Sequence, residues 1–345
     1  MDLSPSSLAE KIQECEQAVQ RSLAACTPSH HAQEPDTVPT LPFHYLQEAL
    51  RVNTPSIFTT YLQWRHAQEV GGEQGKEPIH QALSCISQVL IQEFPDYEQV
   101  VNDFIDASSH LLRDVEQPGP EFPPSGNPLG SLAQEYLQAL LQSDRRQAGE
   151  LIHQAVDRGT SIRDIYLHVF QTSQYEIGRL WQMNKATVAQ EHFCTAATQL
   201  IMSQLYEHIF AMERRGRSLV ATCVGGELHE LGMRMVADFF EMDGWDTVYL
   251  GAGTSTKNIL QTVDDRQPQI VGISSTMTSH VRRVENLVAA IRTRFGPKVK
   301  ILVGGYPFRT TDLWQQVGAD AHGRNAQEAV NAANAFFDPA GSESS

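Results

Sequence analysis

The sequence has few cysteines, no long apolar run and a shortage of basic residues. Its five cysteines are odd in number and form no Cys-x-x-Cys pair, which argues against a disulfide framework and a thiolate zinc site, so we expect reduced thiols. No apolar stretch approaches the roughly 18 residues of a membrane span, and the N-terminus lacks the basic start and apolar core of a signal peptide. The 345-residue chain is therefore expected to be cytoplasmic, to avoid membranes and to form two or three domains.

Basic residues are scarcest in the N-terminal third. The whole chain has 41 acidic against 26 basic residues, and residues 1–128 alone hold 18 acidic against 6 basic. A phosphate backbone repels such a surface, and no basic stripe or recognition helix is evident near the N-terminus. Direct binding to nucleic acid is therefore not expected.

Proline and glycine mark the main boundary in the chain. Between Glu116 and Gly130, five prolines and three glycines disfavour regular structure and predict a linker over residues 116–130. Before it, apolar residues recur at helical spacing without β-alternation. Residues 1–115 are therefore predicted to form an acidic all-helical domain.

Residues 131–215, after the linker, continue the helical pattern. Gly159 should end a second helix, Ser161 and Asp164 offer a capping box for a third, and Thr187 with Gln190 offers one for a fourth. Four helices of this length predict a four-helix bundle.

The periodicity changes over residues 216–338, where short β-branched runs alternate with amphipathic helices. The predicted strands are Leu219–Val224, Thr247–Leu250, Ile270–Ser274, Lys300–Val303 and Asp320–His322. This alternation predicts a doubly wound, flavodoxin-like (Rossmann-like) α/β domain with a parallel sheet, followed by a disordered tail at 339–345. The overall class is thus multi-domain, α and α/β. In such folds ligands lie outside the carboxyl ends of the strands, so the turns after the first, third and fourth strands should line one crevice.

The turn after the first predicted strand carries Glu227 and His229. A carboxylate that accepts one ring N–H of an imidazole fixes the tautomer and leaves the other nitrogen free to bind a metal. A polar turn with a solvated histidine is an equally good interpretation of this turn alone.

Two more motifs stand at fixed distances from this turn. Ser274 and Thr276 follow Gly232 after a gap of 41 residues, and Gly304-Gly305 follows Thr276 after 27 more. The pattern resembles the cobalamin-binding domains of methionine synthase and of corrinoid proteins, in which DxHxxG, SxL or SxT, and GG recur at about these intervals.

This resemblance implies a base-off, His-on corrinoid. His229 would be the lower cobalt ligand and Glu227 its hydrogen-bond partner. Ser274 and Thr276 would lie beside the displaced dimethylbenzimidazole tail, and Gly304 and Gly305 would let backbone approach it without a Cβ clash. Gly232 belongs to the same cofactor-binding motif.

Glu227 stands where most corrinoid proteins have Asp, and ExHxxG is similar to the light-sensing transcription factors of the CarH/LitR type. Those proteins also carry a Trp, a Val seven residues on and a Glu-His pair ten residues on; here the spacing is matched by Trp181, Val188, Glu191 and His192. The resemblance implies an adenosylcobalamin pocket capped by the bundle. The His that follows the Trp in that family is Gln182 here, a departure that puts capture of cobalt after photolysis in doubt.

A subfamily of such photoreceptors, the photocobilins, pairs cobalamin with biliverdin. Candidate residues for a bilin pocket in the helical N-terminal domain, each equally well interpreted as core or surface, are Phe43, His44, Tyr45, Tyr61, Trp64, His66 and His80. Cys85 could anchor a bilin, although an isolated Cys on an apolar helical face is usually core.

The leading hypothesis is a non-enzymatic photoreceptor that binds adenosylcobalamin, with biliverdin as second chromophore. Its partners would be these small-molecule tetrapyrroles, a homo-oligomer that changes with light, and an unknown downstream protein. The alternatives are a corrinoid methyl carrier of a methyltransferase system and a cobalamin-binding antirepressor. The bulky Trp181 with Glu191 and His192 favours the sensor, because a carrier needs an upper face that opens to a methyl donor.

Overall fold

The computed structural model describes residues 2–26, 40–70, 77–113, 122–183, 185–210, 212–309 and 311–338. The chain divides into two compact units, one of residues 1–119 with 182–185 and one of residues 120–181 with 186–345. Within the described ranges, no helix is both long enough and apolar enough to cross a membrane. The predicted tail at 339–345 lies outside the described residues.

The first unit is helical throughout its described residues, as the apolar spacing predicts. Its elements are α1 (Pro5–Glu14), α2 (Glu16–Cys26), α3 (Thr40–Arg51), α4 (Pro55–Val70), α5 (Glu77–Glu93), the 3-10 turn η1 (Pro95–Tyr97) and α6 (Glu98–Arg113). Leu8, Ile12 and Phe58 are fully buried, so amphipathic faces build the core of this unit.

The candidate bilin residues whose side chains are described differ in burial. Tyr45 and Tyr61 stack on each other in the core with ring centroids 4.4 Å apart, whereas His44 is exposed. The side chains of Phe43, Trp64 and His66 lie outside the described residues. Cys85 is buried and disulfide-bonded, so the expectation of a reduced thiol is wrong at this position.

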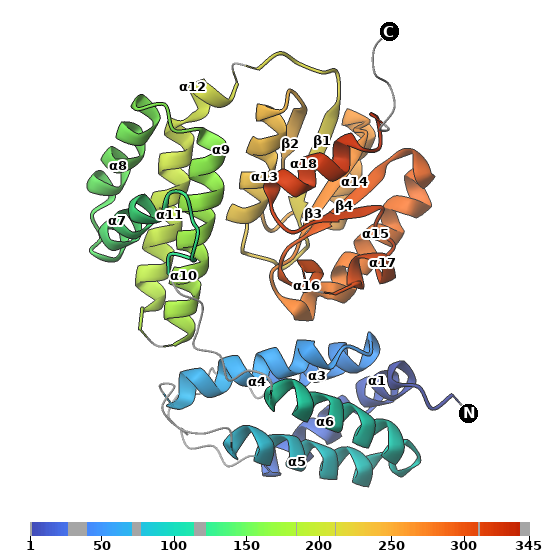
Figure 1. Ribbon diagram of the computed structural model, residues 1–345. Helices are drawn as coiled ribbons and strands as arrows, with labels where there is room; N and C mark the ends of the chain where they lie inside the picture. The colour runs from blue at the N-terminus through green and yellow to red at the C-terminus, as the bar shows by residue number, and fades with distance from the viewer. Residues whose placement is uncertain are drawn as a thin grey trace. The chain divides into compact units, whose positions relative to one another are not determined.

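The second unit begins with the helical bundle (Figure 1). Its helices are α7 (Gly130–Leu141), α8 (Arg145–Asp157), a third helix made of α9 (Ile162–Ile165), the π-helical turn η2 (Tyr166–Phe170) and α10 (Gln171–Gln182), then α11 (Val188–Gln204) and the short α12 (Tyr206–Ile209).

The observed caps of the bundle helices agree only in part with the caps predicted from the sequence. Gly159 has φ +88° after α8, the left-handed conformation that favours glycine, and Thr187 forms the expected capping box with Gln190. Ser161 makes no side-chain cap, so the second predicted capping box is wrong. At the π-helical turn, the side-chain N–H of Asn127 donates to the carbonyl of His168 (2.9 Å) and so attaches the end of the predicted linker to the bundle.

The α/β part contains a parallel sheet, and its described strands match the predicted ones to within two residues at each end. They are β1 (Ser218–Cys223), β2 (Asp246–Tyr249), β3 (Ile270–Ser274), β4 (Lys300–Gly304) and β5 (Ala321–Gly323), in the order β2-β1-β3-β4-β5. This is the flavodoxin-like order, whose topological switch point lies between β1 and β3.

Helices cover both faces of the sheet (Figure 1). On one face α13 (Leu231–Met242) packs against α18 (Ala326–Asn334), and on the other α14 (Thr256–Arg266) packs against α15 (Val281–Phe295). The short helices α16 (Tyr306–Arg309) and α17 (Leu313–Gln316) connect β4 to β5.

The bundle and the sheet share one apolar core, to which α13 contributes buried side chains. The hydroxyl of Tyr166 in the π-helical turn donates to the buried carboxylate of Asp238 on α13 (2.8 Å). The Arg163 guanidinium donates to the carbonyl of Met242 at the end of α13 (2.8 Å). The bundle is therefore held beside the same sheet whose β1 turn carries the predicted site.

Candidate functional site

The carboxylate of Glu227 is the centre of the site. It lies four residues after the end of β1, is fully buried (0% exposed), and accepts six hydrogen bonds from described residues. Oε1 accepts from its own turn: from the backbone N–H groups of Leu228 and His229 (3.0 Å each) and from Nδ1 of His229 (2.5 Å).

The second oxygen of Glu227 is bound by the turn that follows β3. Oε2 accepts from the backbone N–H groups of Thr276 (2.8 Å) and Met277 (3.0 Å), and Nδ1 of His280 lies 3.4 Å away. Because β1 and β3 are neighbours at the switch point, one side chain can join the two turns. This carboxylate fixes the shape of the carboxyl edge of the sheet.

Hydrogen bonding decides the charge state of the pair. Burial alone would raise the pKa of Glu227, but the hydrogen bonds from His229, His280 and the backbone outweigh burial and hold that pKa well below its usual range. The hydrogen bond to Glu227 raises the pKa of His229 against the opposing effect of burial, and the charge of Glu191 adds to the rise. Glu227 is therefore ionised and holds the Nδ1 proton of His229.

This geometry leaves Nε2 of His229 outside the contact with Glu227, on a side chain that is 56% exposed. No group of three or more His, Cys, Asp or Glu side chains that could hold a metal ion occurs in the described ranges. A single imidazole suits a metal whose other ligands come from a macrocycle, as in a corrinoid. The donor set of the site thus fits the cofactor class that the sequence predicts.

The predicted serine, threonine and glycine positions lie at strand ends, on the turns that follow and at the start of α13. Ser274 is buried at the end of β3, and Thr276 binds Glu227 through its backbone. Gly305 has φ +104°, and a Cβ there would stand 1.9 Å from the carbonyl oxygen of Ser275. Glycine is thus required at 305 by contact between two turns, a reason independent of any ligand. Gly232, in contrast, faces open space.

Four predicted residues come from the bundle. Trp181 is half-buried near the end of α10, while Val188, Glu191 and His192 occupy the first turns of α11, where Val188 and His192 are exposed. Glu191 Oε1 accepts from the hydroxyl of Thr195 (3.0 Å). The negative charge of Glu191 contributes to the raised pKa of His229, so the start of α11 acts electrostatically on the site.

Three functional candidates escaped sequence reasoning. His280 shares Glu227 with His229, and Arg283 donates to the carbonyl of Gly225 (2.9 Å). Glu230 accepts from the backbone of Ala252 and from a bundle side chain. All three stand just after strand-end turns or at helix starts, a position that could have drawn attention to them.

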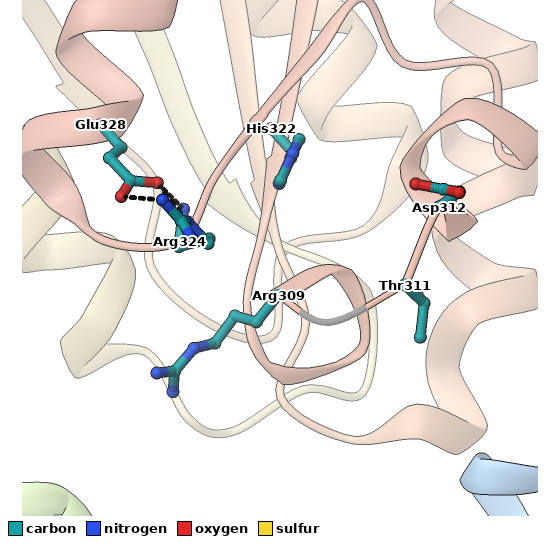
Figure 2. A pocket seen from close by; sticks show the side chains of 6 residues that line it. All are labelled: Arg309, Thr311, Asp312, His322, Arg324 and Glu328. Carbon is teal, nitrogen blue, oxygen red and sulfur yellow. Dashed lines mark hydrogen bonds and ion pairs between the residues drawn. The ribbon is translucent and has the colours of Figure 1, made fainter.

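A hollow of about 450 Å³ lies at the ends of β4 and β5, and none of the predicted cofactor-binding residues lines it (Figure 2). Arg324 and Glu328 form an ion pair (2.9 Å) on one side, and Thr311 and Asp312 lie on the other. Arg309 and His322 complete the lining. The hollow and the Glu227 site are therefore separate features of the same sheet edge.

Comparison with known protein families identifies the class of cofactor and the fold. Residues 217–331 match a family described as "B12 binding domain", and residues 132–206 match a second family with the same description. The cofactor class is therefore cobalamin or another corrinoid, and the helical cap with its Rossmann-like parallel sheet is a corrinoid-binding fold.

Particular relatives are corrinoid proteins. "Trimethylamine corrinoid protein 2" of Methanosarcina mazei is 24% identical over 56% of this chain and 89% of its own length. A corrinoid protein of Desulfitobacterium hafniense is 23% identical over 59% and 96%. The structure of the Methanosarcina barkeri monomethylamine corrinoid protein shares the fold, with a TM-score of 0.55 and 19% identity over 61% of this chain and 100% of that one.

These relatives overturn the light-sensing hypothesis. They are corrinoid proteins, several of them named for methylamines, which contradicts the assignment to CarH/LitR-type photoreceptors, and nothing in them supports biliverdin or an adenosyl group. Biliverdin as a second tetrapyrrole partner and a homo-oligomer that changes with light belonged to that hypothesis and are wrong with it, whereas the corrinoid itself is supported as the cofactor. The misleading signal was the spacing of Trp181, Val188, Glu191 and His192, because spacing places side chains on helix ends without fixing what they contact. Relatives of this kind are compatible with the prediction that the protein is not itself an enzyme.

Proposed function

We propose that this protein is a corrinoid methyl carrier of a methyltransferase system. The observation that carries the proposal is the buried Glu227, which holds Nδ1 of His229 at 2.5 Å and leaves Nε2 on an exposed edge. The names of the relatives support methyl transfer as the use of that site. When bound, the corrinoid supplies a cobalt that can accept and release a methyl group.

The chain's own residues would divide the binding work. His229 would hold the cobalt from below and Glu227 would fix its ring. Ser274, Thr276, Gly232, Gly304 and Gly305 would border the nucleotide tail, as their motif suggests.

The bundle would cover the upper face of the corrin through Trp181, Val188, Glu191 and His192. Exposed apolar side chains at these element ends support such a role, since a macrocycle would remove them from water: Leu228 is 79% exposed, and Val188 and Tyr306 are about half exposed. A methyltransferase would then be the protein partner that displaces or reorients this cover to reach the cobalt.

Residues 1–131 lie outside both matched segments. We propose that they are not needed to bind the corrinoid.

The test is a methyl cycle on the purified, cobalamin-loaded protein. The cobalt is reduced to Co(I) with titanium(III) citrate, methylated with methyl iodide, and then offered a thiol together with a methylcobalamin:thiol methyltransferase, with the absorption spectrum followed throughout. We expect complete conversion to methyl-Co(III) and enzyme-dependent return to Co(I).

Two variants assign the result to the site. His229→Ala should lose the His-on spectrum and bind cobalamin at least 100-fold more weakly, because no neighbouring group replaces an axial imidazole. The matched control is His153→Ala, an exposed histidine of α8 that bonds Gln204, and it should behave as wild type. A protein that binds cobalamin but does not pass its methyl group on, and instead changes size on illumination of its adenosylcobalamin form, would overturn the proposal.

A further inference from the structure

The bundle is attached to the α/β part along one face of α13. Arg234, Asp238 and Met242 follow one another at intervals of four residues, so they lie one above the other on this helix. The Arg234 guanidinium donates to the hydroxyl of Ser203 on α11 (2.7 Å), and the other two accept the bundle contacts described above. Contacts along one helix face define an axis about which the bundle can swing.

A second attachment crosses the carboxyl edge of the sheet, between Tyr175 of the bundle and Arg309 of α16. The central carbon of the Arg309 guanidinium lies 4.9 Å from the centroid of the Tyr175 ring, which is a cation–π contact. Figure 2 shows the Arg309 side chain extending away from Thr311 and Asp312. In the strand order, β3 lies between β1, which precedes α13, and β4, which precedes α16. The Glu227 carboxylate, which joins the β1 and β3 turns, therefore lies between the two attachments.

Both residues of the second attachment stand on anchored helices. Phe308, the neighbour of Arg309, is fully buried, and Ile177, two residues after Tyr175, is also buried. The contact itself is at the surface, since the Tyr175 side chain is about half exposed. A cation–π contact at an exposed position changes an equilibrium about two- to fivefold. This is enough to bias the bundle toward a closed form and weak enough for a protein partner to release it.

We propose that Arg309 and Tyr175 form a latch that holds the bundle closed over the Glu227 site and limits how fast the cobalt is reached. The inference rests on the proposed binding of a corrinoid by His229. Neither latch residue is among those proposed to bind the corrinoid, so the latch stabilises the closed form equally with and without the cofactor. It therefore slows entry and exit of the corrinoid by the same factor and leaves the affinity unchanged.

The experiment compares Tyr175→Leu, Arg309→Gln and the double variant as full-length proteins. Stopped-flow absorption gives the association rate of methylcobalamin, and release into excess hydroxocobalamin gives the dissociation rate. We expect both rates to rise about two- to fivefold in each single variant, with Kd unchanged. The double variant should match the single ones, because either change opens the same latch. Tyr175→Phe, which keeps the ring, and Arg309→Lys, which keeps the charge, should remain close to wild type.

Arg324→Gln is the matched control, because Arg324 lines the same hollow but is paired with Glu328 (2.9 Å). It should leave both rates unchanged. Unchanged rates in both single variants, or effects that multiply in the double variant, overturn the proposal. A weaker Kd with an unchanged association rate also overturns it, because the two residues would then bind the corrinoid directly.

The latch is also measured without cofactor, so its failure is distinguishable from failure of the proposed function. Urea denaturation of the four proteins of the Tyr175 and Arg309 cycle, without cobalamin, should show that the two side chains together change the unfolding equilibrium constant about two- to fivefold beyond the product of their single effects. No coupling in this cycle overturns the latch. A wild-type protein that shows the coupling but does not complete the methyl cycle rejects the carrier function and leaves the latch in place.

Discussion

Replacing Glu227 by Gln removes the charge at the centre of the site while keeping the size of the side chain. An amide has one oxygen and one NH₂ group, whereas both oxygens of Glu227 face donors only. Whichever way the amide turns, two backbone N–H groups lose their acceptor and face another N–H, while the imidazole on that side can change tautomer and accept from the amide. Each buried unsatisfied donor costs about 1–3 kcal/mol, and because turns can relax we expect the lower end, a loss of about 2 kcal/mol in the free energy of unfolding of the second unit.

Urea denaturation of the apoprotein at pH 7 measures this loss. The matched control is Glu328→Gln, because Glu328 is also ion-paired, with Arg324 at 2.9 Å, but at a more exposed position. A pair of that kind contributes about 0–1 kcal/mol, so the control should change little. Glu227→Asp, which keeps the charge and restores the Asp of the common corrinoid motif, should lose less than Glu227→Gln.

The pH dependence gives a second check on the same variant. The folded-state pKa of Glu227 is lowered, so its ionised form stabilises the fold above the unfolded pKa of about 4.3, and this contribution is lost as the pH falls toward the folded value. The difference between wild type and Glu227→Gln should therefore shrink below about pH 4.3. Equal stability of the two proteins at pH 7, or a difference that grows as the pH falls, would refute the argument that the charged carboxylate joins the turns.

Three further changes test other parts of the structure. Gly305→Ala should destabilise the protein by at least about 3 kcal/mol in urea denaturation, because its Cβ would meet the carbonyl of Ser275, whereas Gly126→Ala, also at positive φ but in open space, should cost only about 1 kcal/mol. A chain that starts at residue 129 should bind cobalamin as tightly as the full chain in a spectrophotometric titration; affinity reduced tenfold or more would show that the first unit contributes to the site. Burial raises the pKa of Asp238 to about 6, so its protonation stabilises the fold at low pH and this stability is lost as the pH rises from about 4 to 6. Asp238→Asn should flatten that decline in a series of melting temperatures, and a decline as steep as in wild type would contradict it.

The sequence by itself determined the secondary structure of the second unit and the pairing of Glu227 with His229. Strand positions follow from β-branched runs, and the bonds between Glu227 and His229 are local, formed within three residues of one turn. Local geometry of this kind depends little on the rest of the chain, which is why the short motif also indicated the cofactor class.

The tertiary structure alone decided what surrounds that pair. His280 reaches Glu227 only because β1 and β3 are neighbours in the sheet, an adjacency that hydrophobic periodicity does not encode. Ser161 fails to cap its helix although its local sequence fits a capping box, and Gly305 is fixed by a backbone on another turn. The residues at the bundle end matched a photoreceptor spacing for a related reason: helical periodicity sets the separation of side chains along one helix, whereas their function depends on what the packing of other elements brings against them.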